Sequence, residues 1–403
     1  MRISIKENAY IRQSPERLEL EPLGVLFKGT ELEVLEEPVL GTSLNGNPFW
    51  YVDKKGWYIW SGAVEILDVE VALDYKAIED FSPLKYMNEK ALAWYNKQKG
   101  VNWAIVRERI IDKYWYKQNI RGKGVRISIL DSGIDVLHPD LENCIQAYGD
   151  FSVGPFKTKE DLFGTGTRMA SIIAAQGKFR VTGVAPDAQL YVGKIMNYPN
   201  LLDPESLIAG LKWSYQLKTD IVLIGPKLIR AAFMDSQWEE LKTIIATFSD
   251  LNTVFVIPAG DELTENYKES VFASMQNVIL VSAHDFGSRI IPTSYSGPEV
   301  DVFAPGERLL CARPSSTNGF FSGTQAAASF FTGCLALVIQ EYKNRDIKVD
   351  ARQIKKILTK SLISLKDVSP SKGQKSSSGL FSFESFIKNV QKRLETAHPV
   401  KST

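Results

Sequence analysis

The chain has 403 residues, of which 44% are hydrophobic and 24% are charged, an ordinary composition for a soluble globular protein. Its formal net charge of +1 gives no electrostatic reason to expect a nucleic acid or an anionic membrane as a partner. The sequence contains no run of about eighteen apolar residues that could span a bilayer, and its first residues contain no signal-like apolar stretch. We therefore expect a cytoplasmic protein with no membrane and no nucleic-acid partner.

Residues 1–68 are predicted to form a small all-β barrel. The stretches 9–15, 24–37 and 49–67 alternate apolar and polar residues, and 54–56 (Lys-Lys-Gly) is a tight-turn sequence. About five strands in so short a segment indicate a barrel. The segment resembles a bacterial SH3-like domain in its Ile-Arg-x-x-Pro start, in a Lys-Gly-Thr triplet before a strand, and in Trp-Tyr followed by Gly-Trp-Tyr.

Aromatic residues gather in the third of these stretches. SH3-like domains line their ligand surface in this way, so the resemblance implies a peptide-binding groove. Alternating aromatics would equally fill the core of a very small barrel, and about half of them must then point inward. Docking against the second domain, or binding of bacterial cell wall as many bacterial SH3-like domains do, are further alternatives. The candidate binding residues are Trp50, Tyr51, Trp57 and Tyr58.

The rest of the chain is predicted to be a helical connector, 69–118, and a large α/β domain, 119–395, with a short tail at 396–403. Short runs that are apolar throughout are typical of parallel strands covered on both faces, and helical stretches alternate with them. The predicted strands are 125–130, 189–195, 220–225, 253–260 and 278–283. The predicted helices are 166–176, 204–218, 237–251, 323–342, 351–363 and 382–395. The Ser/Lys/Gly-rich stretch 369–379 is expected to be a loop.

The first polar residue of interest is Asp131, which ends the strand in 122–141 (GKGVRISILDSGIDVLHPDL). A carboxylate at the carboxyl edge of a parallel sheet lies where such folds carry out chemistry, although it could also simply cap a turn. The stretch resembles the aspartate motif of the subtilisin-like serine peptidases, the subtilases. In that family the aspartate matching Asp131 orients the catalytic histidine, and the histidine matching His138 is not catalytic.

Two further family motifs are present, but their reactive residues are different. The segment 164–171 (GTGTRMAS) resembles the histidine motif Gly-His-Gly-Thr-His-Val-Ala-Gly, with Thr165 at the catalytic position and Arg168 at the second histidine position. The segment 322–329 (SGTQAAAS) resembles the nucleophile turn, with Gln325 in place of the serine. Neither His284, on a loop after a strand, nor His398, in the tail, offers a substitute base by sequence.

The oxyanion motif is changed as well. The segment 254–262 (VFVIPAGDE) resembles the strand that ends Ala-Ala-Gly-Asn, where the asparagine amide donates to the oxyanion, and Asp261 stands in that place. A carboxylate would repel the developing charge. The segment 293–311 also resembles the family's approach to the nucleophile turn. The resemblance therefore implies a subtilisin-like three-layer sandwich with a mostly parallel sheet, preceded in the chain by the SH3-like barrel.

The remnant positions Asp131, Thr165, Gln325 and Asp261 cannot perform serine-peptidase chemistry as the family does, since they provide neither nucleophile nor base. The resemblance implies a pseudopeptidase that binds a protein or peptide as a scaffold, a regulator or a partner of an active protease. Relocated or non-peptidase chemistry is the alternative function. No cofactor is expected, and the three cysteines, Cys144, Cys311 and Cys334, are expected to be buried free thiols.

Two expectations concern charges in the old cleft. Asp131, Asp135 and Asp261 could be imagined as a metal site, but without a clear fourth ligand we interpret them as solvated or paired carboxylates. Arg168 lies one helical turn from the old histidine position. We therefore predict that it pairs with Asp131 or Asp261, and we count Arg168 and Asp135 as candidate binding residues.

Overall fold

The structure is a computed structural model, and it describes two parts of the chain. Within 2–66 it leaves out 7–8, 13, 15–23, 35–38, 45–46, 54, 56 and 61–63; within 100–397 it leaves out 154–160, 162, 198–201, 227–232, 262–274 and 366–377. The chain divides into two compact units, Met1–Ser82 and Pro83–Thr403. The predicted boundary near 68 and the part 69–99 of the predicted connector lie outside the described residues.

The described part of the first unit is built of strands only. They form a three-stranded sheet of order β4-β1-β8 and a five-stranded sheet of order β3-β2-β7-β6-β5. Their bounds are β1 Arg2–Ile5, β2 Ala9–Arg12, β3 Gly24–Leu26, β4 Glu31–Glu33, β5 Val39–Leu44, β6 Asn47–Val52, β7 Tyr58–Trp60 and β8 Val64–Ile66. The turn predicted at 54–56 lies largely outside the described residues; at this point Oδ1 of Asp53 accepts hydrogen bonds from the backbone N–H groups of Lys55 (2.8 Å) and Trp57 (2.9 Å). The sequence analysis expected fewer strands, and the SH3-like barrel stays a prediction.

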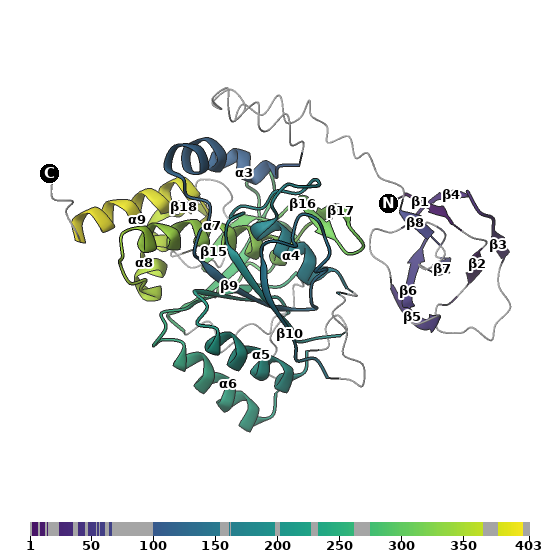
Figure 1. Cartoon of the computed structure of the whole chain (residues 1–403), viewed down its shortest axis with the longest axis horizontal. Helices are drawn as coiled ribbons and strands as arrows, with labels where there is room; N and C mark the ends of the chain where they lie inside the picture. The colour runs from purple at the N-terminus through teal and green to yellow at the C-terminus, as the bar shows by residue number, and fades with distance from the viewer. Residues whose placement is uncertain are drawn as a thin grey trace. The chain divides into compact units, whose positions relative to one another are not determined.

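The second unit is organised around a nine-stranded sheet with Asp131 at the end of a central strand (Figure 1). The strand order is β10-β11-β9-β12-β13-β14-β15-β19-β18, and neighbouring strands are parallel except β18 and β19, which are antiparallel. The bounds are β9 Arg126–Asp131, β10 Ile145–Asp150, β11 Gln189–Lys194, β12 Ile221–Ile224, β13 Val254–Pro258, β14 Val278–His284, β15 Val302–Pro305, β18 Ile363–Ser364 and β19 Gly379–Leu380. A separate antiparallel hairpin is formed by β16 Leu309–Arg313 and β17 Thr317–Phe321.

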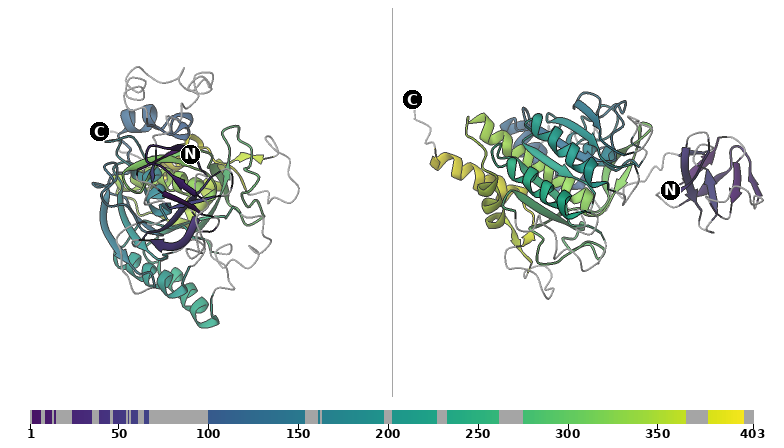
Figure 2. Two further views of the ribbon diagram at one scale, coloured as in Figure 1. Left: turned by 90° about the vertical axis from the view of Figure 1, so that its right-hand side faces the viewer. Right: turned by 90° about the horizontal axis from the view of Figure 1, so that it is seen from below.

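Helices cover both faces of this sheet, with α5 and α6 on one side and α4 and α7 on the other (Figures 1 and 2). Their bounds are α3 Trp103–Arg107, the π-helix η3 Ile111–Tyr116, α4 Thr165–Ala174, α5 Pro204–Gln216, α6 Asp235–Thr247, α7 Thr324–Asn344, α8 Ala351–Ser361 and α9 Phe383–Ala397. Aspartates cap two of these helices: Asp203 accepts from Ser206 N–H at the start of α5, and Asp350 accepts from Arg352 N–H at the start of α8. The predicted three-layer α/β fold is thus confirmed.

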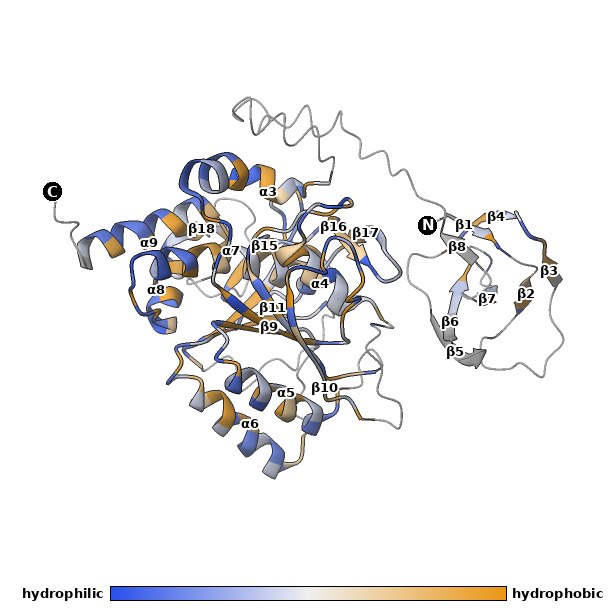
Figure 3. Ribbon diagram, viewed as in Figure 1, coloured by the Kyte–Doolittle hydropathy of each residue, from blue (hydrophilic) through white to orange (hydrophobic). Residues whose placement is uncertain are grey.

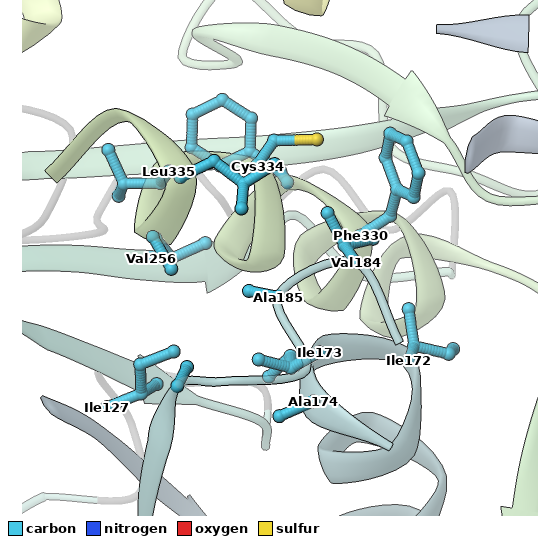
Figure 4. Packing of buried hydrophobic residues seen from close by; sticks show 14 of the residues in the cluster. Ile127, Ile172, Ile173, Ala174, Val184, Ala185, Val256, Phe330, Cys334 and Leu335 are labelled. Atoms are coloured by element: carbon cyan, nitrogen blue, oxygen red, sulfur yellow. The ribbon is translucent and has the colours of Figure 1, made fainter. Parts of the chain in front are cut away.

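The apolar strands divide their side chains between two cores. On β9, Ile127 and Ile129 face the core beneath α4 and α7, whereas Leu130 faces the core beneath α5 and α6. The strand β9 accordingly carries apolar residues between its polar ends (Figure 3). Figure 4 shows the first core, in which Ile173 of α4 and Leu335 of α7 pack between these helices and the sheet. Because both faces of the sheet are covered, its polar residues are placed at the strand ends.

The segment before β9 is built into the second unit. Ile105, Ile110 and Trp115 of the α3–η3 region are buried in the first of these cores. The side-chain amide of Asn102 donates from Nδ2 to the carbonyl of Leu310 (3.1 Å) and accepts at Oδ1 from Leu310 N–H (2.5 Å). The part of the predicted connector that is described therefore packs onto the second unit as expected.

Three smaller expectations concern the cysteines, membrane spans and a loop. The three cysteines are free and buried, as predicted. In the described part of the chain, no helix is both long and apolar enough to cross a bilayer. The predicted loop 369–379 lies almost wholly outside the described residues, as does His398.

Candidate functional site

Asp131 lies at the carboxyl end of β9, fully buried. Its Oδ1 accepts hydrogen bonds from Ser132 N–H (2.7 Å), from Ser132 Oγ (2.9 Å) and from Oγ1 of Thr165. Its Oδ2 has no hydrogen-bond partner among the described residues. Burial raises the pKa of this carboxyl group to about 6; the hydrogen bonds from Thr165 and Ser132 act against this rise, whereas the charge of Asp161 adds to it.

Asp161 is a second buried carboxylate in the same network, and the sequence analysis missed it. It accepts from Ser132 Oγ (2.7 Å), Gly164 N–H (2.8 Å) and both the N–H (2.7 Å) and Oγ1 (2.6 Å) of Thr167. Gly164 and Thr167 stand at the first turn of α4, where a helix has unpaired N–H groups that favour an anion. An aspartate three residues before the Gly-Thr-Gly-Thr turn was the signal that could have identified this cap.

Gln325 lies in the first turn of α7, after Gly323, which adopts a positive φ of 104°. Its side chain is partly exposed, and its Nε2 donates to the carbonyl oxygen of Gly225 (3.0 Å). Gly225 in turn lies against Asp131: a methyl group built on Gly225 would come within 1.8 Å of Asp131 Oδ2. The structure therefore brings Gln325 to the same site as Asp131 and Thr165, as the family order implied.

Asp261, just beyond β13, is exposed, and its carboxylate is fixed against the start of α7. Its oxygens accept from Thr324 N–H (2.9 and 3.1 Å), Thr324 Oγ1 (3.2 Å) and Ser294 Oγ (3.1 Å). The N-cap residue of α7, Gly323, has no side chain, so Asp261, just beyond the end of β13, caps the helix instead. Partial burial of the carboxyl group raises its pKa, and the hydrogen bonds from Thr324 and Ser294 counteract the rise.

The predicted pairing of Arg168 with Asp131 or Asp261 is not among the ion pairs of the described residues. Arg168 is buried, and its guanidinium lies over the ring of Phe321, 5.4 Å from the centroid. The physical reason is that α4 packs against the β16–β17 hairpin, so a side chain one turn beyond Thr165 meets that hairpin. Thr165 itself faces Asp131.

Asp135 connects two loops and does not join the carboxylates at the strand end. Its Oδ1 accepts from Leu137 N–H (3.0 Å) and its Oδ2 from Ser316 N–H (3.3 Å), at the tip of the β16–β17 hairpin. Asp135 thus makes its contacts apart from Asp131 and Asp261, and no group of three Asp, Glu, His or Cys side chains arranged to hold a metal occurs among the described residues.

The two described histidines have structural partners. His138 is buried; its Nε2–H donates to the carbonyl of Thr317 (3.0 Å), and its Nδ1 accepts from Asp140 N–H (3.2 Å). His284 is also buried, and its Nδ1–H donates to the carbonyl of Asp285 (2.7 Å). Burial lowers the pKa of His284 to about 4.

The aromatic residues of the first unit divide into two groups. Trp50 and Tyr51 are buried, so they lie in the interior of the unit and not on a surface that a ligand could reach. Trp57 and Tyr58 are partly exposed, and the ammonium of Lys55 lies over the Trp57 ring, 4.7 Å from its centroid. The correction for Trp50 and Tyr51 follows from the two sheets, which bury consecutive residues of β6.

A cavity of about 400 Å³ lies far from these residues, at the amino ends of β13 and β14. It is lined by Ile245, Ala246, Ser249, Asn252, Thr253, Met275, Gln276, Asn277, Asp350, Ala351 and Arg352. None of the candidate site residues lines it, so it has no place in the site described above.

Known proteins that are similar in sequence or fold identify the family of this chain. The chain is 32% identical to the major intracellular serine protease of Bacillus subtilis, over 56% of this chain and 70% of that protein. It is 27% identical to subtilisin E of Bacillus subtilis, over 72% of this chain and 75% of the relative. The nisin leader peptidase NisP from Lactococcus lactis has a similar fold, with a TM-score of 0.58, 17% identity and coverage of 72% of this chain and 93% of that one. A family model described as the subtilase family matches residues 122–383, and the chain therefore belongs to that family.

Proposed function

We propose that this subtilase binds a protein or peptide without hydrolysing it. The observation that carries the proposal is Gln325 at the nucleophile turn, with its amide engaged by the carbonyl of Gly225. A carboxamide has no nucleophilic oxygen or nitrogen with a usable pKa, so it cannot replace the serine hydroxyl.

The base is also missing from its position. Thr165 cannot take up a proton near neutral pH, and its hydroxyl donates to Asp131. Neither His138 nor His284 can take this role where it stands, because both are buried; both ring nitrogens of His138 and Nδ1 of His284 already bind backbone groups. Loss of the serine or the histidine of such a triad lowers kcat by about 10⁶-fold.

Asp261 adds a third obstacle to peptidase chemistry. An oxyanion is stabilised by donors, whereas this carboxylate itself accepts hydrogen bonds from the start of α7. A negative charge at this point opposes a second negative charge on a tetrahedral intermediate.

Binding does not need these groups. A subtilase cleft can hold an extended peptide by strand addition, which depends on backbone edges and not on the triad. The relatives are named proteases, and nisin leader peptidase is named for a peptide substrate. We propose a scaffold, a regulator or a partner of an active protease as the biological role, and a cytoplasmic location in view of the relative named intracellular.

The test combines an activity assay with a binding assay on the full chain. The protein is incubated with a fluorophosphonate probe and with fluorescein-labelled casein, with subtilisin E as the positive control and Gln325→Ala as the matched variant. We expect no labelling and no casein fragments, together with an increase in the fluorescence anisotropy of labelled casein on binding.

Labelling or cleavage by the unmodified protein would overturn the proposal. If either persisted in Gln325→Ala, the chemistry would lie elsewhere in the chain, as the relocated-enzyme alternative requires. Absence of any casein binding would contradict the retained peptide cleft.

A further inference from the structure

We infer that the peptide taken by this site presents a lysine or arginine side chain to the remnant centre. The inference rests on the proposed function, and it adds the chemistry of the ligand. It follows from the polarity of the groups at the start of α7, which are hydrogen-bond acceptors.

The first acceptor is the side-chain oxygen of Gln325. Because Nε2 donates to the carbonyl of Gly225, the orientation of the amide is fixed, and Oε1 accepts no hydrogen bond from the described residues. The side chain is partly exposed, so a ligand can reach it. The chain thus offers an acceptor at the position where the family has a hydroxyl.

The second acceptor is the carboxylate of Asp261. It binds the N–H of Thr324, the residue that precedes Gln325 in α7. It is exposed, and hydrogen bonds from Thr324 and Ser294 hold it in one orientation. A charge fixed in this way loses little further freedom when a cationic partner binds.

The third acceptor is Oδ2 of Asp131, which is linked to Gln325 through Gly225. It is fully buried, has no hydrogen-bond partner among the described residues, and lies against Gly225, whose carbonyl holds the Gln325 amide. An acceptor left in this state is costly unless a donor reaches it. It adds a negative potential beneath Gln325.

Among the described residues, two cations near the site, Lys194 and Arg168, are both buried and do not reach its surface. Lys194 pairs in register with Asp131 on the neighbouring strand, but it is 1% exposed. Arg168 is 7% exposed and lies over Phe321. The charge that a ligand meets first is therefore that of Asp261.

Ammonium and guanidinium groups carry donors only, which matches an acceptor-lined site. A carboxylate on the ligand would meet Asp261 and Gln325 Oε1, both of which repel it. The same polarity makes an anionic transition-state mimic a poor ligand. A peptide with a basic side chain at this point donates to the two accessible acceptors, Asp261 and Gln325 Oε1, and a neutral peptide leaves them to water.

The experiment measures binding of three fluorescein-labelled peptides to the full chain by fluorescence anisotropy. The peptides are acetylated heptapeptides of alanine whose central residue is arginine, glutamine or glutamate. We expect the arginine peptide to bind about tenfold more tightly than the glutamine peptide, and the glutamate peptide to bind most weakly. The preference should shrink as salt is raised from about 0.05 M to about 0.5 M.

The variant Asp261→Asn keeps an oxygen that can accept from Thr324 and removes the charge, so its arginine-to-glutamine ratio should fall to about one. Asp187→Asn is the matched control: Asp187 is an exposed carboxylate, paired with Arg121, in the loop that precedes β11 at the opposite edge of the sheet. This control should keep the full preference.

The outcomes separate the two proposals. If all three peptides bind equally, the inference is wrong and the proposed function stands. If arginine is preferred equally with and without the Asp261 charge, the assignment to this site is wrong. If none of the peptides binds, both proposals fail. The comparison of the three peptides on the unmodified protein decides the matter even if a variant is unstable.

Discussion

Thr165 donates its hydroxyl hydrogen bond to Oδ1 of Asp131, from the first turn of α4, and leaves Oδ2 of that carboxylate without a partner among the described residues. Burial of a carboxyl group with only one of its oxygens hydrogen-bonded destabilises the fold, and more so when the group is ionised. The stability of the fold should therefore depend on pH through this residue.

The pKa of Asp131 rises from 3.8 to about 6 on folding. As the pH is raised, this carboxyl group therefore ionises at lower pH in the unfolded chain than in the folded protein. The free energy of unfolding should fall as the pH rises from about 4 to about 6, and should stay low above it. The shift corresponds to about 3 kcal/mol. In Asp131→Asn this dependence is absent, so the variant should gain about 3 kcal/mol relative to the unmodified protein between pH 4 and pH 7.5. Urea unfolding of both proteins at the two pH values measures the gain, and an unchanged difference would contradict it.

Asp261 should stabilise α7 as its cap. Removal of the carboxylate in Asp261→Ala leaves Thr324 N–H without its partner and should lower the free energy of unfolding by about 1 kcal/mol. Asp261→Asn retains an acceptor oxygen and should lose less than half of that. Thermal unfolding followed by circular dichroism compares the two variants. Equal losses would mean that the charge, and not the hydrogen bond, fixes the helix start.

Gly225 should tolerate no side chain. A methyl group there would come within 1.8 Å of Asp131 Oδ2, so Gly225→Ala must displace the carboxylate or the strand end, at about 1–3 kcal/mol. Gly287→Ala is the control, because its nearest neighbours lie at 3.4 Å and are ends of flexible side chains. It should change stability by less than about 0.5 kcal/mol. Chemical denaturation of both variants checks the contrast, and similar losses would refute the close contact.

The backbone of the site should accept the family residues. Thr165 and Gln325 are partly exposed and Asp261 is exposed, so the triple variant Thr165→His, Gln325→Ser, Asp261→Asn should fold and melt within about 5 °C of the unmodified protein. Circular dichroism and size-exclusion chromatography provide the measurement. Gross aggregation of the variant would show that the cleft has been rebuilt around its present residues.

The sequence predicted the large unit well because its elements have strong periodic signals. The run Val254–Pro258 is apolar throughout and forms a strand that is covered on both faces. The helix α5 follows Asp203, which is its N-cap, and begins with Pro204. The weaker elements were missed: β10 is a half-exposed edge strand, and the β16–β17 hairpin depends on tertiary contacts with α4.

The site was predicted less completely than the fold. The motifs singled out Asp131, Thr165, Gln325 and Asp261, whose contacts lie at the end of β9 and at the starts of α4 and α7. The orientation of Arg168 could not be read from its position, because a hairpin far along the chain sets its surroundings. Asp161 acts through four donors that only the folded loop assembles.

The pairing of Asn102 with Leu310 has a practical consequence for anyone who expresses the second unit alone. A gene that starts at codon 119, where the sequence alone places the domain boundary, would delete this pair, the bond from Trp103 Nε1 to the carbonyl of Glu307 (2.9 Å), and the buried side chains of Ile105 and Ile110. The product would expose a strip of its core and precipitate. The shortest soluble product should begin at or before codon 100.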